Sequence, residues 1–203
     1  MPRTVDPVLA ADALSRHRQP ELSGTNLLLR PWVEDDAPAI RAAFDVPDIQ
    51  RWHLRRMEDL TEAREWAAAW SRRWAAGSDA SWAITLTGGP THGPASRPPQ
   101  DVAVGYVALR TIFLAEGSAE VSYWVMPQAR GQGVAARAVG VLARWAFTDL
   151  GLHRLSLMHS VANPRSCAAS LRAGFAAEGV LRAHLRHADG WHDMHLHGRL
   201  ASD

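Results

Sequence analysis

The stretch of sequence that decides the fold runs from residue 119 to residue 135 and reads AEVSYWVMPQARGQGVA. Its first half, residues 119–126, is rich in β-branched and aromatic residues and predicts a strand. Its second half places Gly131 and Gly133 directly before a segment with helical character. A glycine-rich turn between a strand and a helix directs backbone N–H groups outward at the positive end of the helix dipole. The stretch therefore predicts a binding site for a pyrophosphate group.

Two arginines supply positive charge to this predicted site. Arg130 lies inside the turn and Arg137 lies one helical turn beyond it. The pattern is not the dinucleotide-binding fingerprint, because the third glycine position is Ala136, no acidic ribose ligand follows about 20 residues later, and three predicted strands precede the turn.

The rest of the chain predicts one α/β domain over residues 23–203, preceded by a loosely ordered arm over residues 1–22. Strands are expected at 25–30, 81–87, 102–111, 119–126, 154–160, 175–185 and 191–200, and helices from about 34, at 61–76, at 133–150 and at 164–173. Residues 88–100 are rich in glycine and proline and predict a mobile hairpin loop rather than a domain boundary.

Composition excludes several kinds of chemistry. All 22 basic residues are arginine, so Schiff-base catalysis and lysine-dependent phosphate loops are excluded. A net charge of +1 gives no basic field for nucleic acid. The single cysteine, Cys167, fits a reducing compartment, and no apolar run resembles a signal peptide or a membrane span. We therefore expect a cytoplasmic protein without a membrane or nucleic-acid partner.

Three tryptophans share one face of the helix expected at 61–76. Trp66, Trp70 and Trp74 are spaced i, i+4, i+8. The stripe either faces the core, or lines part of an acceptor groove, or forms a contact in a homodimer. Trp70 is taken as a candidate substrate-binding residue.

Motifs along residues 25–200 resemble, in the right order, the GNAT superfamily of acetyl-CoA-dependent N-acetyltransferases, and the RimJ/RimL-type branch most closely. They are Leu29-Arg30-Pro31 with Asp35-Asp36-Ala37, the segment 119–125, Gln128-x-x-Gly131-x-Gly133, the segment 150–155, Asn163-x-x-Ser166, and Gly174-Phe175 followed by 178–182. The resemblance implies a single GNAT-type α/β domain. It has a mixed, mostly antiparallel six- to seven-stranded sheet with flanking helices and splayed central strands.

The resemblance also implies acetyl-CoA as cofactor, with its pyrophosphate on the glycine turn and its pantetheine arm between the splayed strands. The implied cofactor-binding residues are Trp124, Val125, Met126, Gln128, Ala129, Arg130, Gly131, Gln132, Gly133, Val134, Ala135, Asn163 and Ser166. Asn163 matches the position that bonds the cofactor arm, although it can equally be only a helix cap.

Acyl transfer to an amine needs a base, an oxyanion donor and an acid for the departing thiolate. Glu120 matches the position of the base in many relatives, and its alternative role is a structural carboxylate paired with an arginine. The backbone N–H groups of Val125 or Met126 are the candidate oxyanion donors. Ser166 matches the position assigned to the acid, and its alternative role is a first-turn helix residue. Cys167 is expected to be a small buried hydrophobe.

The ten histidines raise the question of a metal site. On a strand, His195 and His197 share one face with Asp193, so a carboxylate and two imidazoles could converge. The family resemblance calls for no metal, however, so we expect none and take His195 as a candidate substrate-binding residue. His184 and His187 are alternative bases near the acceptor.

The leading functional prediction is an enzyme that moves an acetyl group from acetyl-CoA to a primary amine by direct attack in a ternary complex. The amine is a protein N-terminus or a small molecule. The alternatives are a transferase of the same fold with another acyl or aminoacyl donor, and a non-catalytic module that binds acyl-CoA.

Overall fold

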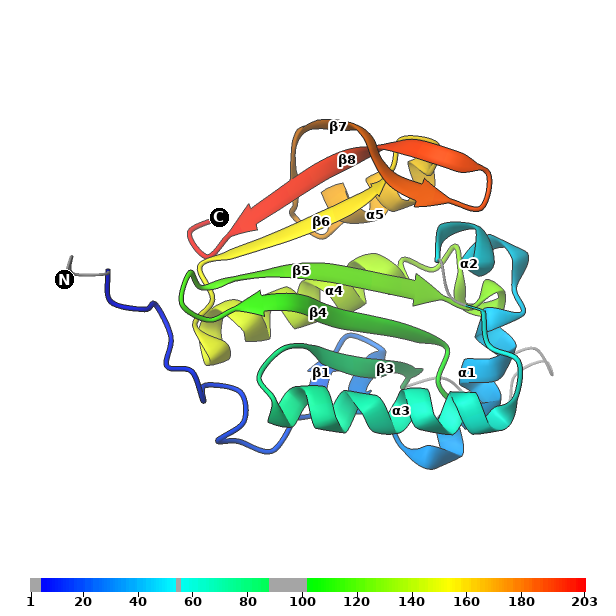
Figure 1. The fold of residues 1–203 in the computed structure, drawn as a ribbon, viewed down its shortest axis with the longest axis horizontal. Coiled ribbons are helices and arrows are strands. Elements are labelled where there is room, and N and C mark those ends of the chain that lie inside the picture. The colour runs from blue at the N-terminus through cyan, green and yellow to red at the C-terminus, as the bar shows by residue number, and fades with distance from the viewer. Residues whose placement is uncertain (1–4, 54–55, 88–101) are drawn as a thin grey trace.

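A computed structural model describes residues 5–53, 56–87 and 102–203 of the chain. They form an α/β domain on one eight-stranded sheet, in the order β1-β2-β3-β4-β5-β6-β8-β7 (Figure 1). All neighbouring strands pair antiparallel except β5 and β6, which are parallel. The α/β class and the mixed, mostly antiparallel sheet are confirmed.

The bounds of the elements follow the sequence-based expectation closely. The strands are β1 (Leu22–Gly24), β2 (Leu27–Pro31), β3 (Ala80–Leu86), β4 (Gly105–Phe113), β5 (Ser118–Val125), β6 (Arg154–Ser160), β7 (Ala176–His187) and β8 (Gly190–Leu200). The α-helices are α1 (Ala37–Phe44), α2 (Pro47–Trp52), α3 (Leu60–Ala75), α4 (Val134–Trp145) and α5 (Pro164–Arg172). A π-helical segment, Ala146–Leu150, follows α4 directly.

The sheet has eight strands rather than the expected six or seven, because β1 forms an additional edge strand. Asn26 adopts a positive φ of 56°, which allows a tight turn after β1. The turn folds Leu22–Gly24 back onto β2, where Leu22 pairs with Leu29.

Helices cover both faces of the sheet (Figure 1). On β4, Val107 and Leu109 belong to the large core cluster beneath α4, whereas the alternate residues Tyr106 and Ala108 pack on the other side with Trp70 of α3. This alternation is the period of two expected for a strand buried on both faces. The sheet therefore separates an α4/α5 side from an α1–α3 side.

The N-terminal arm contains neither helix nor strand over residues 5–21, yet it packs against the domain. Leu14 is 1% exposed. Trp74 Nε1 donates to His17 O at 2.8 Å, and Trp82 Nε1 donates to Pro20 O at 2.7 Å. Apolar and backbone groups of this part of the arm therefore find partners on distant elements.

One helix was not predicted, and one predicted loop is not described by the structure. Helix α2 was not expected from the sequence, although Pro47 in its first turn and Asp48 beside it are typical of a helix start. The hairpin loop predicted at 88–100 lies outside the described residues. Among those that are described, no helix is long and apolar enough to cross a membrane.

Candidate active site

The two central strands separate where the site forms. β5 and β6 pair only from Ser118–Val121 against Arg154–Leu157. Beyond Val121, β5 continues along β4 to Val125, while β6 stays paired with β8 up to Ser160. The diverging arrows of β5 and β6 are visible in Figure 1. The splayed strands are thus present as expected.

A cleft of about 660 Å³ opens at this separation. Its walls come from α2, the end of β5, the turn before α4, and α5. Ten of the predicted cofactor-binding residues line it: Trp124, Val125, Ala129, Arg130, Gly131, Gly133, Val134, Ala135, Asn163 and Ser166. Met126, Gln128 and Gln132 are not among the lining residues.

The glycine turn has the backbone conformation that a close phosphate approach needs. Gly131 and Gly133 adopt φ values of +77° and +70°, and Gly133 is the N-cap of α4. A residue with a side chain is unfavourable at either position, because the backbone there is in the left-handed region. The free N–H groups at the start of α4 and the helix dipole therefore present positive potential to the cleft.

The arginine of the turn is held by two contacts. Arg130 Nε donates to Val125 O at 2.9 Å, and Arg130 Nη1 donates to Asp48 Oδ2 at 2.7 Å. Arg165 also lies 3.8 Å from Asp48 Oδ2. The Asp48 carboxylate on α2 therefore interacts with both guanidinium groups at the rim of the cleft and neutralises part of their charge.

Strand pairing shows which of the two candidate oxyanion donors, the N–H groups of Val125 and Met126, is available. Met126 N–H donates to Val104 O at 2.8 Å, so it is already used inside the sheet. Val125 is paired with Gly105 at the adjacent position. Because N–H groups of an antiparallel strand alternate in direction, the N–H of Val125 is directed away from β4, toward the separation from β6. Val125 is the better candidate.

At the start of α5 three polar groups lie together. Asn163 Oδ1 accepts from the Ser166 backbone N–H at 3.2 Å, so Asn163 caps this helix. The buried Tyr123 hydroxyl has no hydrogen-bond partner of normal geometry among the described residues. Burial raises the pKa of Tyr123, while the nearby Ser166 side chain opposes the rise. Tyr123 thus holds its proton and is a second acid candidate beside Ser166, one that sequence reasoning missed.

Glu120 does not line the cleft. It lies on β5 opposite Arg110 of β4 and Ser156 of β6, on the α1–α3 side of the sheet. Burial raises the pKa of Glu120, and the positive charges of Arg110 and His184 counteract this rise. Both roles considered for this carboxylate, base and partner of an arginine, are compatible with its position.

His53 is a candidate residue that sequence reasoning missed. It follows α2 and lines both the main cleft and a smaller cavity of about 380 Å³. Burial, Arg110 and His187 lower the pKa of His53 to about 4. The imidazole is therefore neutral at neutral pH, and its lowered pKa makes it a weak base. Only the unexpected helix α2 brings it here, so no local pattern could have revealed it.

Two predicted substrate-binding residues lie elsewhere. Trp70 is 3% exposed and packs on Tyr106 with ring centroids 5.6 Å apart, so it belongs to the core beneath α3. His195 lies on β8, where it meets His159 and His197 instead of the cleft. Neither residue is among those that line the cleft. The physical reason is that the side chains of Trp70 and His195 face neighbouring elements of the domain and pack against them instead of facing the cleft.

Comparison with known proteins agrees with this architecture. The family model for an acetyltransferase (GNAT) domain matches residues 26–176. The chain therefore belongs to the GNAT acetyltransferase family, which makes it a transferase of the N-acetyltransferase type.

Individual relatives support the RimJ/RimL-type branch. The chain is 25% identical over 167 residues to the uncharacterized N-acetyltransferase YoaA of Bacillus subtilis, covering 82% of this chain and 88% of that protein. It is 29% identical over 101 residues to the ribosomal-protein-serine acetyltransferase of Escherichia coli, covering 50% and 56%. Mycobacterium smegmatis RimJ, solved with CoA-disulfide, superimposes with a TM-score of 0.75 at 25% identity, covering 90% and 87%.

Proposed function

We propose that this protein transfers an acetyl group from acetyl-CoA to a primary amine. The observation that carries the proposal is the cleft at the separation of β5 and β6, which ends at the turn containing Gly131 and Gly133. A cleft of this shape accommodates an extended arm, and the helix start at its end accommodates a pyrophosphate. The structure of the relative RimJ with CoA-disulfide supports coenzyme A as the ligand.

The residues fit the cofactor as follows. Backbone N–H groups from Gly131 to Ala135 would hold the pyrophosphate, and the pantetheine arm would lie between Val125 and Asn163. Acetyl-CoA supplies a thioester, which is already activated for transfer. The Val125 N–H is directed toward the cleft and would stabilise negative charge on the carbonyl oxygen during attack.

Two proton movements complete the reaction. Glu120 would take a proton from the amine, helped by the raised pKa that makes this carboxylate a stronger base. Because Glu120 does not line the cleft, this transfer would run through a water molecule. Ser166 would provide the proton for the thiolate, whose free pKa is about 8.5.

The acceptor class that we favour is a protein N-terminus. A terminal amine has a pKa of about 8, so it loses its proton more readily than a lysine amine with a pKa near 10.4. The relative from Escherichia coli is named a ribosomal-protein-serine acetyltransferase, which supports a protein as the acceptor. A small-molecule amine is the second candidate, and another acyl donor or a binding function without turnover would be outcomes of the tests.

The cofactor site is tested by Gly131→Glu. A carboxylate at this position would repel the pyrophosphate and strain the turn, so coenzyme A affinity measured by calorimetry should fall at least about 100-fold. Gly131→Ala separates the two causes, because a Cβ at Gly131 meets nothing within 4 Å and only the backbone strain is added.

Gly179→Glu is the matched control. Gly179 is exposed on β7 and its Cβ would also lie in open space, so this variant carries the same charge change away from the cleft. Affinity equal to wild type in Gly131→Glu would refute the assignment of the turn. The acceptor is then identified by offering acetyl-CoA and other acyl-CoA donors with N-terminal peptides and small amines while thiol release is followed.

A further inference from the structure

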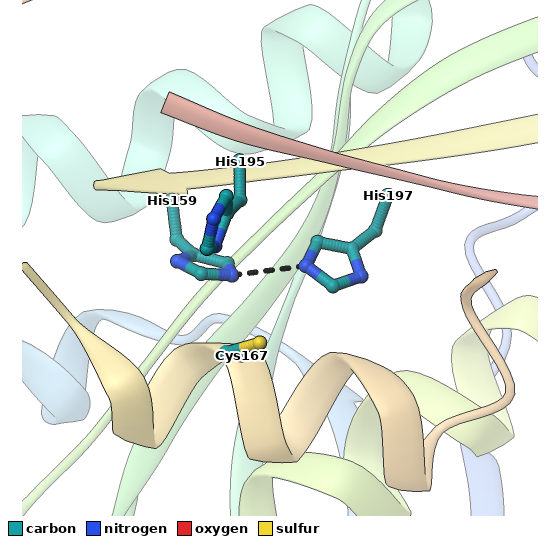
Figure 2. Close-up of side chains that lie close together, drawn as sticks. All are labelled: His159, Cys167, His195 and His197. Atoms are coloured by element: carbon teal, nitrogen blue, oxygen red, sulfur yellow. Dashed lines mark hydrogen bonds between the residues drawn. The ribbon is translucent and has the colours of Figure 1, made fainter. Parts of the chain in front are cut away.

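Four potential metal ligands meet on the α4/α5 side of the sheet, next to the start of α5. His159 lies on β6, His195 and His197 on β8, and Cys167 on α5 (Figure 2). One ligand atom from each side chain lies within 4.8 Å of all the others. The proposed acetyl transfer uses none of them, and His195, the one predicted to bind substrate, does not line the cleft.

Strand register explains why these residues converge. His159 is directly opposite His195, and His197 lies two residues further along β8. Residues at these positions share one face of the sheet. Helix α5 packs over that face, and Figure 2 shows its Cys167 side chain directed toward the three rings.

The hydrogen bonds within the cluster prepare one histidine as a metal ligand. His159 Nδ1 lies 2.9 Å from Ser160 O, and since a carbonyl can only accept, this nitrogen carries the proton. The Nε2 lone pair of His159 is then directed at the cluster. A ring N–H bonded to a backbone carbonyl is the usual support of a metal-bound histidine.

Other ring nitrogens of the cluster lack partners. His197 Nε2 can donate to His159 Nε2 at 3.1 Å, so without a metal this pair forms one hydrogen bond. His195 Nδ1 and His197 Nδ1 are buried with no hydrogen-bond partner among the described residues. His197 is fully buried and His159 is 6% exposed. Unpaired buried polar atoms are costly, so hydrogen bonding alone accounts poorly for this cluster.

The ligand chemistry suits zinc. Three imidazoles and one thiolate form a four-coordinate nitrogen and sulfur set, which Zn²⁺ prefers in structural sites. Bond lengths of about 2.0–2.1 Å to nitrogen and 2.3 Å to sulfur separate tetrahedral ligand atoms by about 3.3–3.6 Å. The 3.1 Å between the two Nε2 atoms is close to this range. The other ligand atoms lie within 4.8 Å of one another, so they would have to move closer together around the ion.

We propose that His159, Cys167, His195 and His197 bind one Zn²⁺ ion as a structural site. Binding would release the Cys167 thiol proton to solvent and form one Zn–S and three Zn–N bonds. The ion would fasten α5 to β6 and β8. Because Ser166 and Asn163 belong to the start of the same helix, zinc would also fix one wall of the cleft.

Zinc binding is tested on the full chain after removal of metal with a chelator. Calorimetry with Zn²⁺ should show one site per chain in the wild type. Cys167→Ser and His195→Ala should each weaken binding by more than about 100-fold, since even the loss of a supporting group costs 10–100-fold in affinity. His192→Ala is the matched control, because His192 lies on β8 but bonds Ser160 and Asp189 outside the cluster.

Cobalt provides a readout that identifies the ligands. Co²⁺ bound to the wild type should show intense visible bands of tetrahedral coordination and a near-ultraviolet thiolate charge-transfer band. Cys167→Ser should lose the charge-transfer band, whereas His192→Ala should keep both. Absence of stoichiometric binding in the wild type, or binding unchanged in both Cys167→Ser and His195→Ala, would overturn the proposal.

Thermal unfolding distinguishes loss of the zinc site from loss of the fold. Added Zn²⁺ should raise the midpoint of the wild type and of His192→Ala, but not that of Cys167→Ser. A cooperative thermal transition of zinc-free Cys167→Ser verifies that this variant is folded. A zinc-induced increase that persists in Cys167→Ser and His195→Ala would place the metal elsewhere and contradict the site.

Discussion

Ser166 and Tyr123 present two hydroxyl groups at the same end of the cleft, and only one needs to supply the proton to the thiolate. We expect Ser166→Ala to lower kcat about 100-fold, the usual contribution of a general acid, with coenzyme A affinity nearly unchanged. The substitution keeps the backbone N–H that Asn163 caps, so α5 retains its start. Steady-state kinetics and calorimetry together measure both quantities.

The variants Tyr123→Phe and Ser170→Ala complete this comparison. Ser170 is fully buried on α5 and donates to Ser166 O at 2.9 Å, so Ser170→Ala removes a hydroxyl from the same helix outside the cleft. Its kcat should stay near that of the wild type. A large loss in Tyr123→Phe with normal turnover in Ser166→Ala would transfer the acid role to Tyr123, whose raised pKa keeps it protonated.

At the level of elements, the contact between β4 and β5 controls the shape of the cleft. A Cβ on Gly105 would lie 2.7 Å from Trp124 O and 3.0 Å from Ile84 Cδ1. Backbone cannot yield as a flexible side chain does, so Gly105→Ala should push the end of β5 outward. We expect it to lower the free energy of unfolding by about 1–3 kcal/mol, measured by urea denaturation, and to weaken coenzyme A binding.

Gly140→Ala is the matched control for this substitution. Gly140 lies inside α4 and its Cβ would meet nothing within 4 Å. Alanine in a helix interior is more favourable than glycine by about 0.5–1 kcal/mol, so this variant should be stabilised. If Gly105→Ala unfolds at the same urea midpoint as the wild type, a Cβ at position 105 is tolerated beside β5 and the prediction is wrong.

For the whole molecule, the lowered pKa of His53 makes stability depend on pH. Its pKa is about 4 in the folded chain and 6.5 in the unfolded chain, so between these values the unfolded state binds more protons. Stability is therefore full above pH 6.5 and is lost as pH falls toward 4. Since one pKa unit corresponds to about 1.4 kcal/mol, the difference of about 2.5 between the two pKa values of His53 contributes at most about 3–4 kcal/mol to this loss.

His53→Gln removes the titrating group and should flatten the pH profile. The urea midpoint of the wild type should fall more steeply than that of the variant between pH 6.5 and pH 4. Exposed His184 on β7 offers a control, because His184→Gln also removes an imidazole but should retain the wild-type slope. Parallel profiles for wild type and His53→Gln would show that His53 does not carry the dependence.

Much of the fold follows from local patterns that the sequence displays directly. Runs of strand-forming residues predicted β3 to β8 to within a few residues, and the glycine turn predicted the start of α4. β1 and α2 were missed, because a three-residue strand and a six-residue helix carry too few residues to show a period. Their existence depends on a turn at Asn26 and on packing against distant elements.

Some features of the candidate site were likewise predictable from the sequence, and others were not. The sequence by itself determined the α/β class, the strand, turn and helix around Gly131 and Gly133, and the cap of α5 by Asn163, because each depends on neighbours within a few residues. Only the tertiary structure decided that Trp70 is core, that His53 reaches the cleft, and that His195 meets Cys167 and two other histidines. These relations join segments tens of residues apart, and packing and strand register, which no local pattern contains, determine them.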